Sequence, residues 1–180
     1  MCAVDVDLII VVVEVAEVSG KLLDSAKQAR ADSGSKVGHI DFHVLKSADM
    51  LNDTIGKVRE EYPYLFHKTR LLGRPYTYDQ MDKLWNGLIA LRSSRFATSQ
   101  MNQLAESLFT GRRESTLFFR YQHSRDRSTA YTQLEKLLGE LQPTTATDPV
   151  PWQRVSGGKL DYDFQTALWD LAELYDFVPR

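Results

Sequence analysis

Cysteine is almost absent from this chain, since Cys2 is the only one among 180 residues. One cysteine cannot form a disulfide within the chain, so the fold has to rest on a buried apolar core. Hydrophobic residues make up 43% of the sequence, an ordinary value for a globular protein that can build such a core. The scarcity of cysteine also favours a reducing, cytoplasmic compartment.

No apolar run in the sequence is long enough to cross a membrane. The strongest run, LIIVVVEVAEV over residues 8–18, is interrupted by Glu14 and Glu17. It follows Asp5 and Asp7, where a signal sequence would carry lysine or arginine. A membrane-spanning helix needs ~20 apolar residues in succession. We therefore expect a buried element of a soluble protein that has no membrane partner.

The same segment leaves helix and strand open as alternatives. Its valines and isoleucines favour a strand. Its apolar residues recur at helical spacing, and polar residues lie seven apart on the opposite side, at Asp7, Glu14, Lys21 and Gln28. We expect a long helix at about 5–31, with an early strand over residues 4–18 as the alternative.

Motifs for catalysis and for cofactor binding are missing from the sequence. It contains no GxSxG, no phosphate-binding loop, no GxGxxG, no CxxC and no HExxH. His39 and His43, in GHIDFH, have the spacing of one helical turn that suits metal ligands. A metal site needs a further ligand, and the only other histidine near them in sequence is His67. We therefore expect no enzyme activity, no cofactor and no metal site.

Apolar residues recur at spacings of three and four through most of the chain, which predicts helices and no confident strand. Pro63, Gly73 and Gly111 mark the ends of three of these helices. This pattern predicts an all-α fold, a single-domain bundle of six to seven helices. Besides the first helix, the expected helices cover approximately residues 40–58, 62–73, 77–92, 101–109, 128–141 and 161–177.

The stretch QPTTATDPVPWQRVSGG, residues 142–158, is rich in proline, threonine and glycine. Such a composition indicates an extended linker or an exposed loop. The sequence therefore predicts three parts: a helical bundle over residues 1–141, a linker over 142–160, and an acidic, aromatic helix over 161–180. We expect this last helix to dock on the bundle, with binding of a partner as the alternative.

Charge is distributed unevenly although the formal net charge is only −2. Residues 1–61 and 128–180 are each net −4, whereas residues 62–127 are net +6 and contain nine arginines against two lysines. The planar guanidinium of arginine pairs with carboxylates and phosphates through two hydrogen bonds. The basic centre therefore either pairs with the acidic ends of the chain or stays open for an anionic partner.

The stretch GRRESTLFFRYQHSRDRS, residues 111–128, carries five of these arginines. On a helix, Leu117, Phe118 and Tyr121 would face inward. The basic side chains would form a column at spacings of three, four and seven on another face, namely Arg113, Arg120, His123 and Arg127. The candidate binding residues of the whole chain are Arg112, Arg113, Arg120, His123, Arg125, Arg127, Trp169 and Tyr175.

We expect the arginine column to bind carboxylates in preference to nucleic acid. Residues 92–127 contain seven arginines and no lysine, which suits planar pairing, and aromatic residues that pack in a core are not free to stack on bases. The sequence thus predicts a non-enzymatic protein that binds a protein partner or itself, as an adaptor, inhibitor, immunity protein or complex subunit. A phosphate or nucleic-acid binder that uses the arginine face is the alternative.

Overall fold

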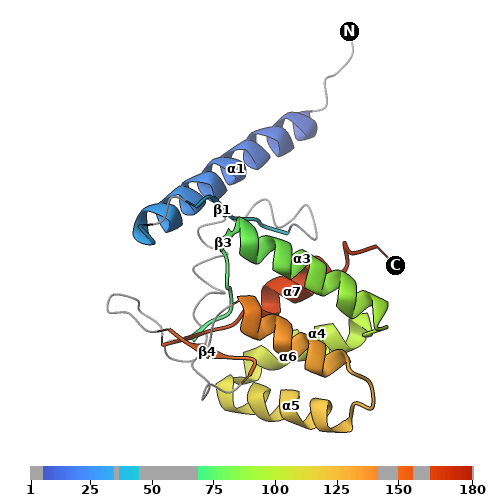
Figure 1. Ribbon diagram of the computed structural model, residues 1–180. Coiled ribbons are helices and arrows are strands. Elements are labelled where there is room, and N and C mark those ends of the chain that lie inside the picture. Colours follow the sequence, from blue (N-terminus) through green and yellow to red (C-terminus); the bar gives the residue numbers. More distant parts are fainter. Residues whose placement is uncertain (1–5, 35–36, 45–68, 142–149, 156–162, 180) are drawn as a thin grey trace. The chain divides into compact units, whose positions relative to one another are not determined.

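A computed structural model describes residues 6–34, 37–44, 69–141, 150–155 and 163–179. This part of the chain is mostly helical, with six α-helices, one 3-10 helix and five strands of two residues each (Figure 1). The prediction of a mostly helical protein is therefore confirmed. The expected all-α bundle is confirmed only in part, because two small sheets accompany the helices.

The chain divides into two compact units where the sequence pattern indicated one bundle. The first unit comprises Met1–Glu61 and Pro75–Tyr78, and the second comprises Tyr62–Arg74 and Asp79–Arg180. Of the linker expected over residues 142–160, only residues 150–155 are described, so that linker stays a prediction.

The first unit is built from one long helix and a two-stranded ribbon. Helix α1 (Val6–Asp32) confirms the helix expected at about 5–31, and the alternative of an early strand is wrong. No helix in the described part of the chain has the length and apolar character that a membrane crossing requires. The left-handed backbone of Gly34, with φ of 60°, follows the end of α1.

Strand β1 (His39–Ile40) pairs antiparallel with β3 (Tyr76–Thr77), and the ring of Phe42 stacks on Tyr76 with 6.4 Å between centroids. The helix expected over residues 40–58 is thus wrong at its start. Ile40 lies in a strand and residues 41–44 form no helix, while most of the expected helix lies outside the described residues. Pairing with β3, 36 or more residues away, is a long-range interaction that local spacing does not reveal.

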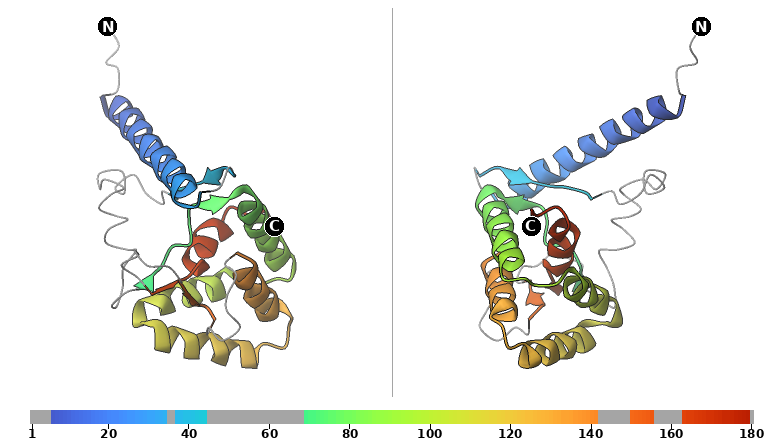
Figure 2. Two further views of the ribbon diagram at one scale, coloured as in Figure 1. Left: turned by 60° about the vertical axis from the view of Figure 1, so that its left-hand side comes forward. Right: turned by 90° about the vertical axis from the view of Figure 1, so that its right-hand side faces the viewer.

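Five α-helices and one 3-10 helix form most of the second unit, whose boundary falls after the first residue of α3. They confirm the helices expected near residues 77–92, 101–109 and 128–141 to within a few residues. Helix α4 packs against α5 and α7, α5 packs against α6, and α3 lies beside α6 (Figure 1, Figure 2). The elements are α3 (Tyr78–Ser93), α4 (Thr98–Ser107), η2 (Leu108–Thr110), α5 (Arg112–Arg125), α6 (Ala130–Leu141) and α7 (Leu168–Tyr175).

The second unit also contains a three-stranded sheet that the sequence pattern did not predict. Its strand order is β2 (Thr69–Arg70), β5 (Phe164–Gln165) and β4 (Gln153–Arg154), with β5 parallel to β2 and antiparallel to β4. Two expected helices are corrected by this sheet. The described end of the segment 62–73 is a strand, and the C-terminal helix begins at Leu168 instead of near residue 161.

The core of the second unit is built from leucines of α3, α4, η2, α6 and α7 and from a cluster of aromatic rings. Phe96 reaches the core because α3 ends in a reversal, in which Arg95 adopts a left-handed φ of 60° and the N–H of Phe96 bonds to the carbonyl of Leu91. The ring of Phe96 then meets Tyr131 and Tyr175 edge-on, at centroid distances of 5.2 and 6.4 Å. Through these edge-to-face contacts, the turn that follows α3 packs against both α6 and α7.

The start of α6 is held by two side chains of the preceding turn. Ser128 accepts a hydrogen bond on its hydroxyl oxygen from the N–H of Ala130 at 3.1 Å. Asp126 accepts hydrogen bonds from the N–H groups of Ser128 and Tyr131. Burial by itself would raise the pKa of Asp126, but the hydrogen bonds from Ser128 and Tyr131 outweigh it and the pKa is lowered.

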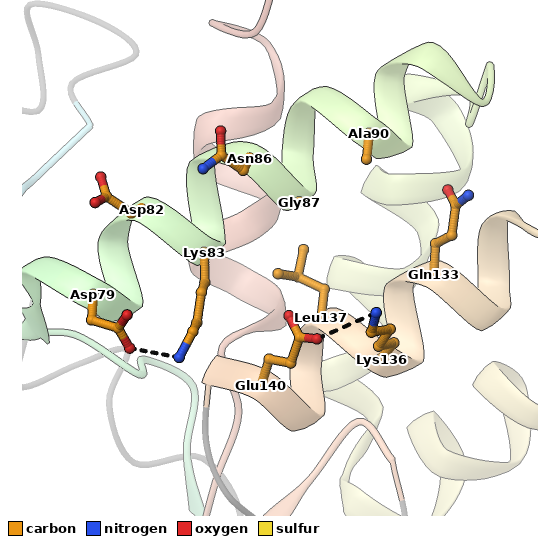
Figure 3. Close-up of a pocket in the computed structure, with 10 residues that line it drawn as sticks. All are labelled: Asp79, Asp82, Lys83, Asn86, Gly87, Ala90, Gln133, Lys136, Leu137 and Glu140. Carbon is orange, nitrogen blue, oxygen red and sulfur yellow. Dashed lines mark hydrogen bonds and ion pairs between the residues drawn. The ribbon is translucent and has the colours of Figure 1, made fainter.

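Helices α3 and α6 lie in close contact at Gly87 of α3 and Leu137 of α6 (Figure 3). A Cβ atom on Gly87 would lie 2.4 Å from Cδ1 of Leu137, far inside van der Waals contact. Gly139 on α6 has no such constraint, since a Cβ atom there would meet nothing within 4 Å. Substitution of Gly139 therefore tests helix propensity alone, whereas substitution of Gly87 also tests the packing of α3 against α6.

We predict opposite effects for alanine at these two glycines. Gly139→Ala should raise the free energy of unfolding by ~0.5–1 kcal/mol, because alanine favours a helix over glycine. Gly87→Ala should lower it by about 1 kcal/mol, because an overpacking cost of ~1–3 kcal/mol exceeds the same propensity gain. Urea unfolding followed by circular dichroism measures both, and a stabilised Gly87→Ala variant would contradict the close approach of α3 and α6.

Candidate functional site

Helix α5, which carries four of the nine arginines of the basic centre, turns a small hydroxyl-bearing face toward the core. The helix follows Gly111, whose φ of 111° favours glycine. Its buried residues are Ser115, Thr116 and Phe119. These are not the residues that the sequence pattern placed on the inner face. The difference arises because the hydroxyl groups of Ser115 and Thr116 form hydrogen bonds inside the protein.

Both hydroxyl groups find hydrogen-bond partners without water. Ser115 donates from Oγ to the carbonyl of Gly111 at 2.7 Å, and Thr116 donates to the carbonyl of Arg112 at 2.8 Å. Ser115 also accepts a hydrogen bond of 2.8 Å from Nε1 of Trp152, which is itself buried. A buried polar group that is fully hydrogen-bonded avoids the desolvation penalty, so Ser115 and Thr116 take the places that larger apolar residues were expected to fill.

The displaced inner face leaves two large side chains of α5 in solvent. Leu117 is 58% exposed and Tyr121 is 53% exposed, whereas Phe118 is half-buried. The prediction that Leu117 and Tyr121 face inward is therefore wrong. The expectation that the aromatic residues of α5 are not free for contact with a partner is wrong for Tyr121.

Two arginines lie on the same side of α5 as these side chains. Arg113 and Arg120 are exposed, and neither lies within ion-pair distance of a carboxylate in the described part of the chain. Their spacing places them one turn from Leu117 and beside Tyr121. We call the group Arg113, Leu117, Arg120 and Tyr121 the α5 outer face.

The other basic candidate residues of this stretch are engaged elsewhere or lie at the edges of the α5 outer face. His123 turns to α6, where Nδ1 lies 3.5 Å from a carboxylate oxygen of Glu135 and its ring stacks on Tyr131. Arg112 lies over the ring of Phe164, with 4.0 Å between the guanidinium carbon and the ring centroid. The structure therefore brings together only part of the column that the spacing predicted.

Arg125 belongs to the end of α5 and contacts the outer face. Its guanidinium donates a hydrogen bond to the hydroxyl of Tyr121 and lies 5.2 Å from the centroid of that ring. Arg127 follows the helix and is exposed. Arg125 thus orients Tyr121 on the surface of the helix.

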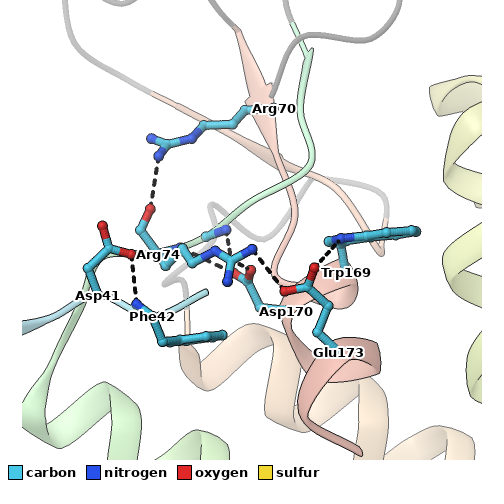
Figure 4. Close-up of polar contacts among 8 residues, drawn as sticks. Asp41, Phe42, Arg70, Arg74, Trp169, Asp170 and Glu173 are labelled. Carbon is cyan, nitrogen blue, oxygen red and sulfur yellow. Dashed lines mark hydrogen bonds and ion pairs between the residues drawn. The ribbon is translucent and has the colours of Figure 1, made fainter. Parts of the chain in front are cut away.

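The acidic C-terminal helix finds its ionic partner in Arg74, a residue that the sequence pattern did not single out (Figure 4). Nε of Arg74 lies 3.2 Å from Asp170, and Nη2 lies 2.8 Å from Glu173. Asp170 also accepts hydrogen bonds from the backbone N–H groups of Gly73 and Arg74, at 2.7 and 3.1 Å. The side chains of Arg74 and Asp170 are 3% and 0% exposed, so both charges are buried.

Glu173 has a different environment from Asp170 although both pair with Arg74. Its second carboxylate oxygen accepts a hydrogen bond of 2.9 Å from Nε1 of Trp169. Burial raises the pKa of Glu173, and the nearby charge of Asp170 adds to this effect, against the opposing attraction of Arg74. The ionised form of Glu173 is therefore less stable in the folded protein than the neutral form, relative to the unfolded chain.

The two aromatic candidates on α7 hold the helix in place. Tyr175 is fully buried and donates a hydrogen bond of 2.6 Å to the carbonyl of Phe96. The guanidinium carbon of Arg92 lies 4.6 Å from the centroid of the Tyr175 ring. Trp169 is half-buried and meets the ring of Phe109 edge-on at 5.0 Å. These contacts position both rings within the second unit.

The histidine pair does not have the geometry that its spacing suggested. His39 lies in β1 and His43 follows in a segment without helical structure, so the two are not one helical turn apart. Among the described residues, no three histidine, cysteine, aspartate or glutamate side chains gather closely enough to hold a metal ion. The expected absence of a metal site stays a prediction.

What the fold and the site define is a mostly helical protein with an exposed arginine and aromatic face on one helix. Comparison of the chain with protein-family models, with curated protein sequences and with solved structures found no match.

We predict that Asp170 is essential for stability and that an exposed acid near it is not. Asp170→Ala should lower the free energy of unfolding by ~3–5 kcal/mol, because it removes one of the two carboxylates that pair with the buried Arg74 and also the acceptor of two backbone N–H groups. Asp176→Ala, which removes an exposed carboxylate just beyond α7, should change it by less than ~0.5 kcal/mol. If urea unfolding showed equally small changes in the free energy of unfolding for Asp170→Ala and Asp176→Ala, the buried pair of Asp170 and Arg74 would not stabilise the fold.

The raised pKa of Glu173 predicts a pH dependence of stability with a definite sign. Between the ordinary pKa of 4.5 and its raised value, the folded state binds more protons at Glu173 than the unfolded state does. Stability must therefore fall as the pH rises through this window. The free energy of unfolding of the wild type, measured relative to Glu173→Gln from pH 4 upward, should decrease with pH, and a relative increase would contradict the burial of this carboxyl.

Proposed function

We propose that this chain is a non-enzymatic macromolecular-interaction protein that binds an acidic segment of a protein partner on the α5 outer face. The observation that carries the proposal is the exposure of Leu117 and Tyr121 on the same face of α5 as Arg113 and Arg120. Tyrosine and arginine are enriched among the residues that dominate binding energy at protein interfaces. Adaptor, inhibitor, immunity-type and complex-subunit roles all agree with such a face, and the single cysteine favours a cytoplasmic location.

The charge of α5 supports an acidic partner. The helix carries four arginines against Glu114 alone, which gives it a net charge of +3 within a chain of net charge −2. The acidic side chains of α7 do not compete for this charge, because Asp170 and Glu173 pair with Arg74. A free guanidinium pairs well with a carboxylate through two parallel hydrogen bonds.

Binding of single-stranded nucleic acid is the second candidate function. It is supported by the exposure of Tyr121, since aromatic rings beside arginines are typical stacking platforms for bases. Leu117 weighs against it, because an exposed leucine at the centre of the face offers a base neither a ring nor a hydrogen bond. Apolar contact at the centre of a charged rim is instead typical of protein interfaces.

We predict that the double substitution Arg113→Gln with Arg120→Gln abolishes partner binding without loss of stability. Each lost arginine should weaken binding by at least ~10-fold if it acts as an interface hot spot. The stability change should stay within ~0.5 kcal/mol, because both side chains are exposed. Leu117→Ser should weaken binding of a protein and leave binding of nucleic acid unchanged.

The measurement is affinity capture from nuclease-treated lysate of the native host, with mass spectrometry, followed by titration of the captured partner. Arg95→Gln, which removes an exposed arginine outside α5, is the matched control. A protein captured by the wild type and by this control, and lost in the double variant, would support the proposal. Sub-micromolar binding of a single-stranded oligonucleotide at physiological salt that collapses in the double variant would show the second function to be the correct one.

A further inference from the structure

A second exposed apolar position of the second unit lies at the end of α7. Among the described large apolar side chains, Phe177 is the most exposed, at 61%, and it follows α7 by two residues. Leu117 and Tyr121 on the α5 outer face are the next most exposed within this unit. An aromatic ring held in solvent at a fixed position is a typical anchor of a protein interface.

The residues that follow α7 form an ordered turn. The N–H of Phe177 bonds to the carbonyl of Leu174 at 3.0 Å, and the N–H of Val178 bonds to the carbonyl of Tyr175 at 3.4 Å. The side chain of Val178 is buried, which fixes the turn on the second unit. We call residues 176–178 the α7 terminal turn. Because this turn is ordered before a partner arrives, binding through Phe177 costs little conformational entropy.

The α7 terminal turn carries an exposed negative charge next to Phe177. The carboxylate of Asp176 forms neither an ion pair nor a hydrogen bond within the described part of the chain. The other two acids of the C-terminal helix, Asp170 and Glu173, pair with Arg74. The turn therefore presents an aromatic ring and an available carboxylate side by side.

The α5 outer face is complementary to this turn in both charge and apolar character. The guanidinium groups of Arg113 and Arg120 have no carboxylate within ion-pair distance among the described residues. A guanidinium pairs with a carboxylate through two parallel hydrogen bonds. The exposed Leu117 and the ring of Tyr121 offer an apolar surface on which an aromatic side chain can pack.

The two surfaces cannot meet within one molecule of the protein. Figure 1 and both views of Figure 2 show that the chain leaves α7 at the end of the second unit opposite α5. Helix α4 packs against both α5 and α7 and therefore lies between them. A contact between the α7 terminal turn and the α5 outer face requires two copies of the chain.

We propose that the acidic segment bound by the α5 outer face is the α7 terminal turn of a second copy of this chain. The inference rests on the proposed function and names the partner of that same face. A contact between unlike surfaces leaves one α5 outer face and one α7 terminal turn available at the two ends of every pair. Further copies therefore add head to tail, and the assembly grows with protein concentration.

The test is analytical ultracentrifugation of the full, nuclease-treated chain. The weight-average mass of the wild type should rise as the concentration increases from ~1 µM to ~1 mM, because a contact of so few residues is weak. Added salt should lower this mass, since exposed pairs of arginine and carboxylate are screened. Asp82→Lys, which reverses an exposed charge on α3, is the matched control and should associate as the wild type does.

Two double variants separate the two surfaces. Arg113→Gln with Arg120→Gln removes the charge of the α5 outer face, and Asp176→Lys with Phe177→Ser removes both features of the α7 terminal turn. Each variant alone should associate at least ~10-fold more weakly than the wild type. All four side chains are exposed, so thermal unfolding followed by circular dichroism should be unchanged.

An equimolar mixture of the two double variants should recover association, but only as a dimer. The first variant keeps an intact α7 terminal turn and the second keeps an intact α5 outer face, so one contact forms and no surface remains for a third copy. The milder single substitutions Leu117→Ser and Asp176→Ala should also weaken association of the chain with itself, which keeps the test valid if a double variant unfolds.

Several outcomes would overturn the proposal. A wild type that stays monomeric up to ~1 mM would do so, as would undiminished association of either double variant or a mixture of folded variants that forms no dimer. A monomeric wild type whose α5 face still captures another acidic protein, lost in Arg113→Gln with Arg120→Gln, would leave the proposed function standing. Capture that this double substitution does not change would instead contradict the proposed function itself.

Discussion

The carboxylate of Asp170 is the group on which the second unit depends most. One oxygen of this carboxylate forms a buried ion pair with Arg74, and the other accepts hydrogen bonds from two backbone N–H groups. A buried charge of this kind is tolerated only when its partners are all present, so α7 has to lie where Gly73 and Arg74 can reach it. That position also brings Tyr175 into the aromatic cluster and β5 alongside β2. A single ionic contact thus joins segments almost 100 residues apart.

The same ion pair determines which charged side chains remain free to bind a partner. Asp170 and Glu173 of the acidic C-terminal helix both pair with the buried Arg74, so they do not neutralise the positive charge of α5. Helix α5 in turn buries Ser115, which is hydrogen-bonded to Trp152, and exposes Leu117 and Tyr121 beside Arg113 and Arg120. The basic outer face is therefore a consequence of where the acids and the tryptophan are used inside the fold.

The sequence predicted that the candidate site is basic and lies on one helix, but it did not predict which side chains of that helix are exposed. The stretch from Arg112 to Arg125 stands out in the sequence by its arginines, and it does form one helix. Spacing alone misassigned its faces, because serine and threonine count as polar in a pattern and yet can be buried once hydrogen-bonded. Arg74 carries no signal of its own in the sequence, since its partners lie 96 and 99 residues further along the chain.

The sequence by itself determined the helices whose apolar residues repeat at helical spacing, among them α1, α3 and α6, because that periodicity is a local property. It also determined the basic character of the central segment. Only the tertiary structure decided the short strands, the start of α7 at Leu168, the burial of Arg74 and the face that α5 exposes. Each of these depends on hydrogen bonds or ion pairs between residues far apart in the chain, and such contacts leave no repeating pattern in the sequence.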